Sequence, residues 1–199
     1  MRMSRKRMRK GSMGKMGNIL KGFKLWTAEE EVYCIAYGSN LCEERMKSRC
    51  PDSRVFGTSV IIGYRLLFKR SCTGYYATIE QDANCEVPVV IYKMSAMDEA
   101  RLDRFEGYPR YYHKQEFLLP VWGLKGKKLK NRRQCIAYIM HEDRILGYPT
   151  YDYFRLLDEG YERWGFDKEL LYKALSDSMG ERLSKGWIKD YEKEKKKNE

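Results

Sequence analysis

Residues 32–41 read Val32-Tyr33-Cys34-Ile35-Ala36-Tyr37-Gly38-Ser39-Asn40-Leu41, and this stretch decides the fold. Its first half is a run of β-branched, aromatic and small apolar residues, typical of a buried strand, and the run stops at Gly38. Asn40 has the position of an N-cap for a helix over residues 41–50, which Pro51 ends. Such a turn gathers backbone N–H groups that suit a carboxylate or an oxyanion, although an ordinary strand-to-helix turn is the alternative.

The composition fits one folded domain with charged tails. The chain has 199 residues, 43% of them hydrophobic and 34% charged, and a formal net charge of +11. Residues 1–24 carry nine Lys or Arg and no acid, and residues 124–133 carry six and no acid. Without these segments and the basic tail at 181–199, the rest of the chain is acidic. The pattern predicts non-specific attraction to polyanions and no specific nucleic-acid site.

The cysteines and histidines argue against a metal site. The six cysteines form no C-x-x-C pair, and the chain has only two histidines, His113 and His141. Cys34 and Cys135 lie in apolar runs and read as small buried hydrophobes. We therefore expect no metal, reduced thiols and a cytoplasmic location. No apolar segment approaches the ~20 residues that a membrane span needs, and no secretory signal is expected.

The middle of the chain is rich in strand patterns. We expect strands at 54–60, 61–69, 75–80, 87–94, 111–121 and 134–140, with a polar turn at 81–86 and a basic loop at 124–133. Ser95 and Asp98 predict a variant capping box for a short helix whose buried side chains include Met97, Leu102 and Phe105. Thr150 and Asp167 should cap helices that run to about Trp164 and Met179, and a further helix should follow from Glu181.

Glu106 is expected at the end of the short helix, beside Gly107 and a Tyr108-Pro109 bend. The partial negative charge of a helix C-terminus disfavours an ionised carboxylate and raises its pKa. A raised pKa suits a group that takes a proton and returns it. For a single glutamate considered alone, a solvated surface position is the commoner interpretation.

A second stretch reads Leu102-Asp103-Arg104-Phe105-Glu106-Gly107-Tyr108-Pro109-Arg110-Tyr111-Tyr112. Together with residues 37–41 it resembles the γ-glutamylcyclotransferase family, in its bacterial and AIG2-like branches. The resemblance runs from about Tyr33 to Asp167. It also includes Gly63-Tyr64-Arg65-Leu66, Ala77-Thr78-Ile79, Pro149-Thr150-x-x-Tyr153 and Glu159-Gly160-Tyr161-x-x-Trp164-Gly165.

The resemblance implies an α+β fold, with a small, mixed, mostly antiparallel β-barrel-like sheet and helices around it. The pattern alone supports only a β-rich middle between short helices. We expect three regions: a flexible basic arm at 1–27, the γ-glutamylcyclotransferase-like domain at 28–180, and a helical basic tail at 181–199. An amphipathic segment on an acidic surface is the alternative for the arm.

The resemblance also implies an activity, the conversion of a γ-glutamyl amine or γ-glutamyl amino acid into 5-oxoproline and a free amine. The α-amino group attacks within the substrate, no cofactor is needed, and Glu106 is the general acid and base. The residues implied to bind substrate are Tyr37, Gly38, Ser39, Asn40, Leu41, Tyr112, Tyr138 and Tyr153. The turn reads Gly-Ser-Asn-Leu and not the Gly-Ser-Leu of the branch that degrades glutathione, so glutathione is not assigned as substrate.

Two other functions stay open at this point. The same fold could hold a non-catalytic pocket for an amino-acid-like ligand, or the tails could bind acidic partners. A homodimer is also open, while the expected partner is a small γ-glutamyl molecule.

Overall fold

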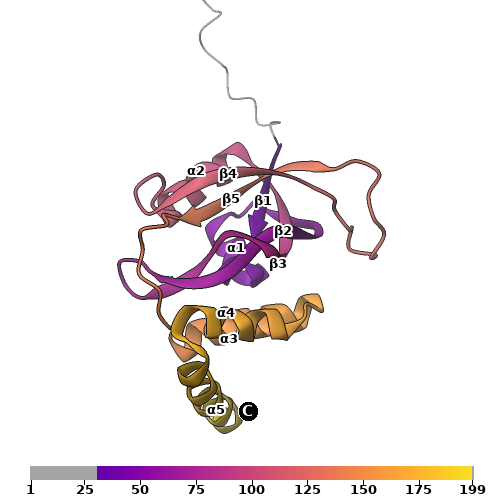
Figure 1. Ribbon diagram of the computed structural model, residues 1–199. Coiled ribbons are helices and arrows are strands. Elements are labelled where there is room, and N and C mark those ends of the chain that lie inside the picture. Colours follow the sequence, from indigo (N-terminus) through magenta and orange to yellow (C-terminus); the bar gives the residue numbers. More distant parts are fainter. Residues whose placement is uncertain (1–30, 199) are drawn as a thin grey trace, which may run out of the picture.

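A five-stranded sheet forms the centre of the computed structural model, which describes residues 31–198 (Figure 1). The order of the strands is β2-β3-β1-β5-β4. β1 and β5 pair in parallel and all other neighbours are antiparallel. The strands are β1 (Glu31–Ala36), β2 (Arg54–Arg70), β3 (Tyr75–Ser95), β4 (Tyr112–Leu119) and β5 (Arg133–Met140). The arm predicted at 1–27 lies outside the described residues.

The two edges of the sheet meet, which gives it the character of a barrel. Thr58 in β2 donates from its N–H to the Trp122 carbonyl at 2.8 Å, and the Trp122 N–H donates to the Thr58 carbonyl at 2.9 Å. Trp122 follows β4, so this bridge joins the two edge strands. The approach needs Gly57, where a Cβ would lie 2.2 Å from the Trp122 carbonyl oxygen. The α+β fold with a mostly antiparallel, barrel-like sheet is confirmed.

β2 and β3 are longer than predicted, because the polar residues at 81–86 do not form a turn. The pairing passes from Ile62 opposite Glu86 to Tyr64 opposite Gln81, so residues 82–85 bulge out. The Asn84 N–H donates to the Asp82 carboxylate at 3.1 Å, which satisfies the bulge locally. Gly63 opposite it has φ of 80°, a conformation that glycine adopts without strain. The apolar residues on both sides of the bulge continue the pairing of β2 with β3, and this pairing overrides the turn propensity of residues 81–86.

The helices surround the sheet and begin largely where the capping residues predict. They are η1 (Ser39–Leu41), α1 (Glu43–Arg49), α2 (Ala96–Glu106), α3 (Tyr151–Trp164), α4 (Lys168–Met179) and α5 (Glu181–Asn198). The side chains of Ser95, Thr150 and Asp167 each accept a backbone N–H bond at the start of α2, α3 and α4. α3 and α4 lie along one side of the sheet, and α5 extends away from it (Figure 1).

Two further local predictions are wrong. Asn40 is not an N-cap, because it lies inside the short turn η1 and the residue before α1 is Cys42. In α2, Leu102 is fully buried as predicted, but Met97 and Phe105 are 63% and 56% exposed. The helix is rotated to bury Asp98, whose carboxylate accepts the Asp52 N–H at 2.8 Å. A buried acid needs such partners, and this need decides which face of α2 is inward.

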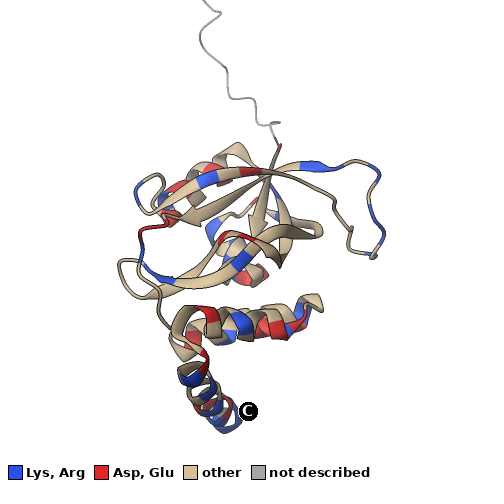
Figure 2. Cartoon of the chain, in the orientation of Figure 1, with Lys and Arg blue, Asp and Glu red and all other residues tan. Residues whose placement is uncertain are grey.

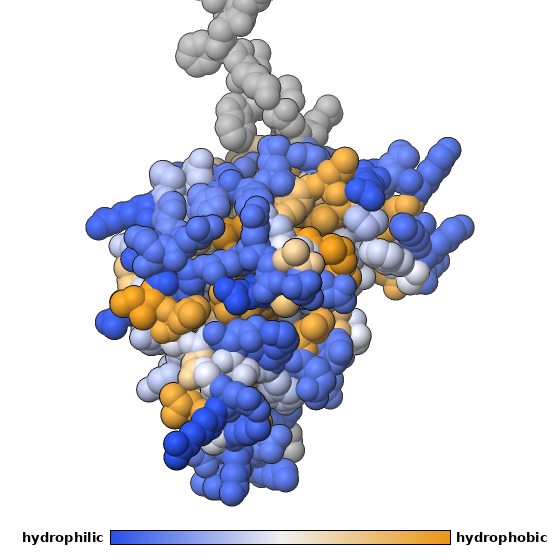
Figure 3. Space-filling model, viewed as in Figure 1, coloured by the Kyte–Doolittle hydropathy of each residue, from blue (hydrophilic) through white to orange (hydrophobic). Residues whose placement is uncertain are grey.

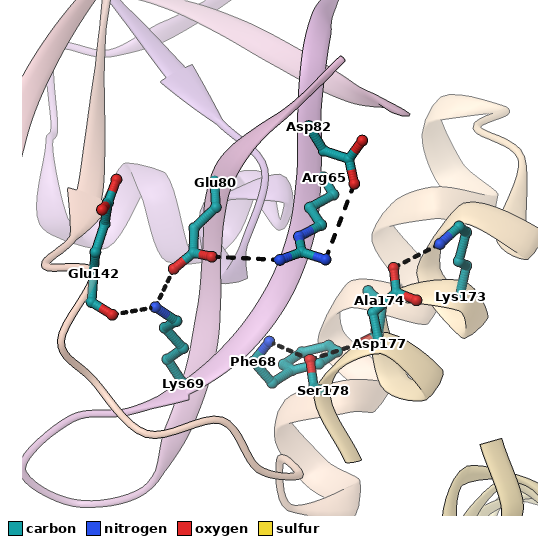
Figure 4. A network of polar contacts seen from close by, with 10 residues as sticks. All are labelled: Arg65, Phe68, Lys69, Glu80, Asp82, Glu142, Lys173, Ala174, Asp177 and Ser178. Carbon is teal, nitrogen blue, oxygen red and sulfur yellow. Dashed lines mark hydrogen bonds and ion pairs between the residues drawn. The ribbon is translucent and has the colours of Figure 1, made fainter. Parts of the chain in front are cut away.

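Polar contacts fasten α4 and the segment after β5 to the long β2–β3 ribbon (Figure 4). The Ser178 hydroxyl accepts the Phe68 N–H at 2.8 Å and donates to the Ala174 carbonyl at 2.6 Å. Lys69, which is 4% exposed, pairs with Glu80 and donates to the Glu142 carbonyl at 2.7 Å. These bonds fix the end of the ribbon, whose residues 71–73 line the pocket described below.

An aromatic cluster attaches α5, the helix expected from Glu181. Trp187 and Tyr191 of α5 pack against Tyr151 and Phe154 of α3. Beneath them the buried Asp158 accepts bonds from Tyr191 Oη at 3.1 Å and from Lys195 Nζ at 2.8 Å. The cluster therefore braces the beginning of α3, and Tyr153 lies in this first turn.

The surface mixes apolar and charged groups. On the face in Figure 3, apolar side chains form scattered patches between hydrophilic ones. The loop at 124–133 extends from the body after β4 and shows basic residues along its length (Figure 2). All six cysteines are free thiols, and three of them, Cys34, Cys50 and Cys135, are buried. Within residues 31–198, no helix combines the length and apolar character that crossing a membrane requires.

The closure of the barrel can be tested at Gly57. Gly57→Ala should lower the free energy of unfolding by about 1–3 kcal/mol, because the methyl group would overlap the Trp122 backbone. As a control, Gly186→Ala at an exposed position of α5 meets nothing within 4 Å and should stabilise by up to about 1 kcal/mol. Urea unfolding measures both. A Gly57→Ala protein as stable as the wild type would contradict the close approach of the two edges.

Candidate active site

A pocket of about 420 Å³ opens where the end of β1, the turn η1, the end of α2 and the tip of the β2–β3 ribbon meet. Its size lies within the ~300–1,000 Å³ usual for small-molecule sites. The backbone pairing explains why these segments converge. β3 runs antiparallel to β1 and ends with Ser95 beside Glu31, at the start of β1. α2 follows at once, so its C-terminal end lies near the turn that follows β1.

The pocket brings together the predicted turn and the predicted acid. Gly38, Ser39 and Asn40 line it together with Glu106. Asn40 Nδ2 donates to Glu106 Oε1 at 3.4 Å, across 66 positions of sequence. Both segments thus contribute to one cavity, in the arrangement that an acid and a set of main-chain donors would need to flank a single ligand.

The four predicted tyrosines, Tyr37, Tyr112, Tyr138 and Tyr153, line the same pocket. The Tyr37 hydroxyl donates to the Tyr138 carbonyl, and the Tyr138 hydroxyl donates to Asp103 at 2.6 Å. The Tyr153 hydroxyl accepts the Ala77 N–H at 3.1 Å. Burial raises the pKa of all four phenols well above that of free tyrosine, so they are neutral at physiological pH. Their contact with substrate stays a prediction.

Leu41 is the exception among the predicted residues, because it does not line the pocket. Its side chain is fully buried against Gly160 of α3, where a Cβ would lie 2.7 Å from the Leu41 Cβ. Its carbonyl accepts a bond from Trp164 Nε1 at 2.9 Å. Leu41 therefore anchors the turn from beneath. An apolar side chain at this point of the turn packs into the core while its neighbours face the cavity.

Glu106 is the last residue of α2 and precedes Gly107, whose φ is 67°. Burial raises the pKa of Glu106 to about 7, against the lowering effects of Arg49 and of the hydrogen bond from Asn40. The direction agrees with the prediction, but the main cause is loss of water and not the helix terminus. Near neutral pH this carboxyl is present in both protonation states.

Arg49, at the end of α1, is a pocket residue that the sequence argument missed. Its Nη1 donates to Ser39 Oγ at 3.1 Å and to Asn40 Oδ1, and its guanidinium lies 3.7 Å from the centre of the Phe105 ring. Burial lowers the pKa of Arg49, while Glu106 raises it. Arg49 therefore joins the turn to α2. The available sequence signal was its spacing of four from Arg45, which places both arginines on one face of the helix, while Met46 is buried on another face.

The described part of the chain contains no group of three His, Cys, Asp or Glu side chains placed to hold a metal ion. The lining of the pocket thus includes one partly buried carboxyl, one turn with main-chain donors, three guanidinium groups and several neutral phenols. These groups can transfer protons and stabilise negative charge.

Comparisons with known proteins identify the family of the chain and relatives of its fold. A family model described as Gamma-glutamyl cyclotransferase, AIG2-like, matches residues 34–160. A solved structure named Gamma-glutamyl cyclotransferase is 26% identical over 73% of this chain and 86% of its own, with a TM-score of 0.63. The uncharacterized protein loc79017 from Homo sapiens is 28% identical over 73% and 87%, also with 0.63. YkqA from Bacillus subtilis shares the fold at 20% identity over 77% and 57%, with a TM-score of 0.56. No curated protein matches the sequence.

The raised pKa of Glu106 predicts how stability depends on pH. The pKa of Glu106 is 4.5 in the unfolded chain and about 7 in the folded protein. Between these two values the unfolded chain is the more ionised state, so the folded state loses stability as pH rises through this interval. Glu106→Gln removes the loss and should be the more stable protein at about pH 8, by at most about 3 kcal/mol. Urea unfolding between about pH 5 and pH 8 measures the difference.

Glu159→Gln, at an exposed position of α3, serves as the matched control and should follow the wild type. If the difference between wild type and Glu106→Gln did not change with pH, Glu106 would be solvated like a surface acid.

Proposed function

Since the chain belongs to the gamma-glutamyl cyclotransferase, AIG2-like family, as its sequence predicts, we propose that it converts a γ-glutamyl amine or γ-glutamyl amino acid into 5-oxoproline and a free amine. The observation that carries the proposal is the meeting of the Glu106 carboxyl and the turn at 38–40 in one pocket. The free thiols fit a cytoplasmic location for the reaction.

The reaction takes place within one substrate molecule. The α-amino nitrogen bonds to the γ-carbonyl carbon, the bond from this carbon to the leaving nitrogen breaks, and a five-membered lactam results. No water is consumed. A pocket that holds the glutamyl group in its ring-closing shape can supply a large part of the ~7–11 kcal/mol available from proximity. The protein must add a proton carrier and donors for the oxyanion.

Glu106 is the proposed proton carrier. The α-ammonium group must lose a proton before its nitrogen can attack, and the leaving nitrogen must gain one. A carboxyl whose burial raises its pKa to about 7 is ionised often enough to take the first proton and acidic enough to give it back. The hydrogen bond from Asn40 keeps the carboxylate directed at the cavity.

The main-chain N–H groups of residues 38–40 are the proposed anion site. Within the turn, the Leu41 N–H donates to the Gly38 carbonyl at 2.9 Å and the Cys42 N–H to the Ser39 carbonyl at 3.4 Å. The N–H groups of residues 38–40 bond to no carbonyl within the turn, and the Ser39 N–H faces the Tyr153 hydroxyl. Together with this hydroxyl they would face either the substrate α-carboxylate or the developing oxyanion. A single donor of this kind contributes ~10²–10³ in rate in comparable sites.

The neutral hydroxyls of Tyr37, Tyr112, Tyr138 and Tyr153 complete the proposed binding site. Since burial keeps their pKa values high, they orient polar groups of the glutamyl head without adding charge. Arg49 holds Ser39 and Asn40 in place through its hydrogen bonds. Glutathione is not part of the proposal, because the turn reads Gly-Ser-Asn-Leu.

Replacement of the proposed proton carrier tests the reaction. Glu106→Gln should keep the fold and ligand-induced thermal stabilisation but lower 5-oxoproline release at least about 10²-fold, because the amide cannot carry a proton. Chromatographic detection of 5-oxoproline from a panel of γ-glutamyl amino acids and γ-glutamyl amines measures it. Glu159→Gln should retain full activity. Full activity in Glu106→Gln would refute the role, and wild-type binding without product from any compound would favour the non-catalytic alternative.

The pH profile offers an independent check. The kcat/KM of the wild type should rise with pH and level off above about 7, as Glu106 ionises. Arg49→Met removes a charge that lowers the Glu106 pKa, so the midpoint should move to higher pH. Arg182→Met, at an exposed position of α5, should leave the midpoint unchanged. A midpoint shifted downward by Arg49→Met would contradict the assignment.

A further inference from the structure

The pocket carries an excess of positive charge. Among the described residues that line it, three are arginines, Arg45, Arg49 and Arg104, and one is a carboxylate, Glu106. The side chains opposite, Ser71, Cys72 and Thr73, add no acid. The excess stands out because the chain outside its basic segments is acidic and because helices such as α3 and α4 mix both signs of charge (Figure 2).

Two of these arginines have no acidic partner among residues 31–198. Arg49 is occupied by the turn and by Phe105, as described above. Arg45 and Arg104 are exposed, and within residues 31–198 no carboxylate lies at ion-pair distance from either. Their neighbours behave differently, since Arg101 pairs with Asp98 at 2.7 Å and Arg163 with Glu43 at 2.6 Å.

Arg45 and Arg104 lie at the solvent-facing mouth of the pocket. They are exposed, whereas Tyr37, Tyr112 and Tyr138 on the inner wall are buried. Arg45 also lies close enough to Arg49 for its charge to lower the pKa of Arg49. Like charges four apart on a helix destabilise it slightly, so α1 gains nothing in folding from this arrangement.

The charges of the substrate can be matched against those of the pocket. A γ-glutamyl head brings one ammonium, which the Glu106 carboxylate complements, and one carboxylate, which the turn at 38–40 and the nearby Arg49 can complement. The glutamyl head then leaves Arg45 and Arg104 unmatched. With the glutamyl head at Glu106 and the turn, the part of the substrate nearest to the mouth would be the leaving amine.

We propose that Arg45 and Arg104 select the leaving amine by its charge and favour an amine that carries a carboxylate over a neutral or cationic one. The inference rests on the proposed function and narrows its substrate class. Exposed ion pairs are weak, and two of them supply a preference of roughly tenfold that decreases as salt is added.

The test compares three substrates that differ in the charge of the leaving group. They are γ-glutamyl-alanine, its neutral isostere γ-glutamyl-alaninamide, and the cationic γ-glutamyl-putrescine. The kcat/KM should fall in this order, with roughly tenfold between the first two, mainly through KM and less at high salt. Equal kcat/KM for the alanine and alaninamide compounds would overturn the inference.

Variants separate selection from general damage to the site. Arg45→Met combined with Arg104→Met should bring the ratio between the alanine and alaninamide compounds close to one. Arg182→Met, which removes an exposed arginine far along the chain on α5, should keep the wild-type ratio. An unchanged ratio in the double variant would show that these arginines do not select the leaving group.

A binding experiment tests the selection of the leaving amine separately from the proposed reaction. Calorimetry on Glu106→Gln gives affinities for the alanine and alaninamide compounds without turnover. Tighter binding of the alanine compound, lost in the triple variant with Arg45→Met and Arg104→Met, supports the inference. Equal affinities overturn it. Absence of 5-oxoproline from every compound with the wild type overturns the proposed function instead, whatever the affinities are.

Discussion

The antiparallel pairing of β1 with β3 is the constraint on which the site depends. The register sets Glu31 opposite Ser95 and Ala36 opposite Val90, so β3 delivers the chain to the beginning of β1. The six residues of β1 extend about 20 Å, and the eleven residues of α2 rise about 16 Å. Because α2 starts directly at Ser95 and returns over a similar distance, its last residue, Glu106, reaches the turn after β1. Gly107 then ends the helix at that point.

The same few contacts hold the turn and set the chemistry of the acid. Arg49 donates to Ser39 and Asn40, and Asn40 donates to Glu106. Burial raises the Glu106 pKa to about 7, whereas Arg49 and Asn40 lower it, so the value results from opposed effects of which burial is the largest. A carboxyl without these partners would be protonated more firmly, and a solvated one would be ionised. The contacts that position Glu106 therefore also determine its pKa.

The sequence predicts what local chemistry determines. Caps at Ser95, Thr150 and Asp167 and the glycine after Glu106 mark helix ends, because each side chain or φ angle satisfies groups within one turn. Features set by distant partners were missed. The rotation of α2 follows from the bond between Asp98 and Asp52, the bulge at 82–85 from pairing on both sides of it, and the place of Arg49 from its contacts with Phe105 and the turn. None of these partners can be identified from spacing along the chain.

The sequence motifs shared with the family have two different physical roles, lining the pocket and supporting the turn. Residues 38–40 and Glu106 face the cavity, whereas Leu41, Gly160 and Trp164 form a support on its far side. Only a glycine at 160 lets α3 approach Leu41, and the Trp164 indole fixes the Leu41 carbonyl, so the turn cannot relax away from the pocket. Donors held in this way need no reorganisation when charge develops, which is the condition for electrostatic stabilisation. Arg45 and Arg104 take no part in this support, so their side chains can change the choice of leaving group without disturbing the groups proposed to carry the reaction.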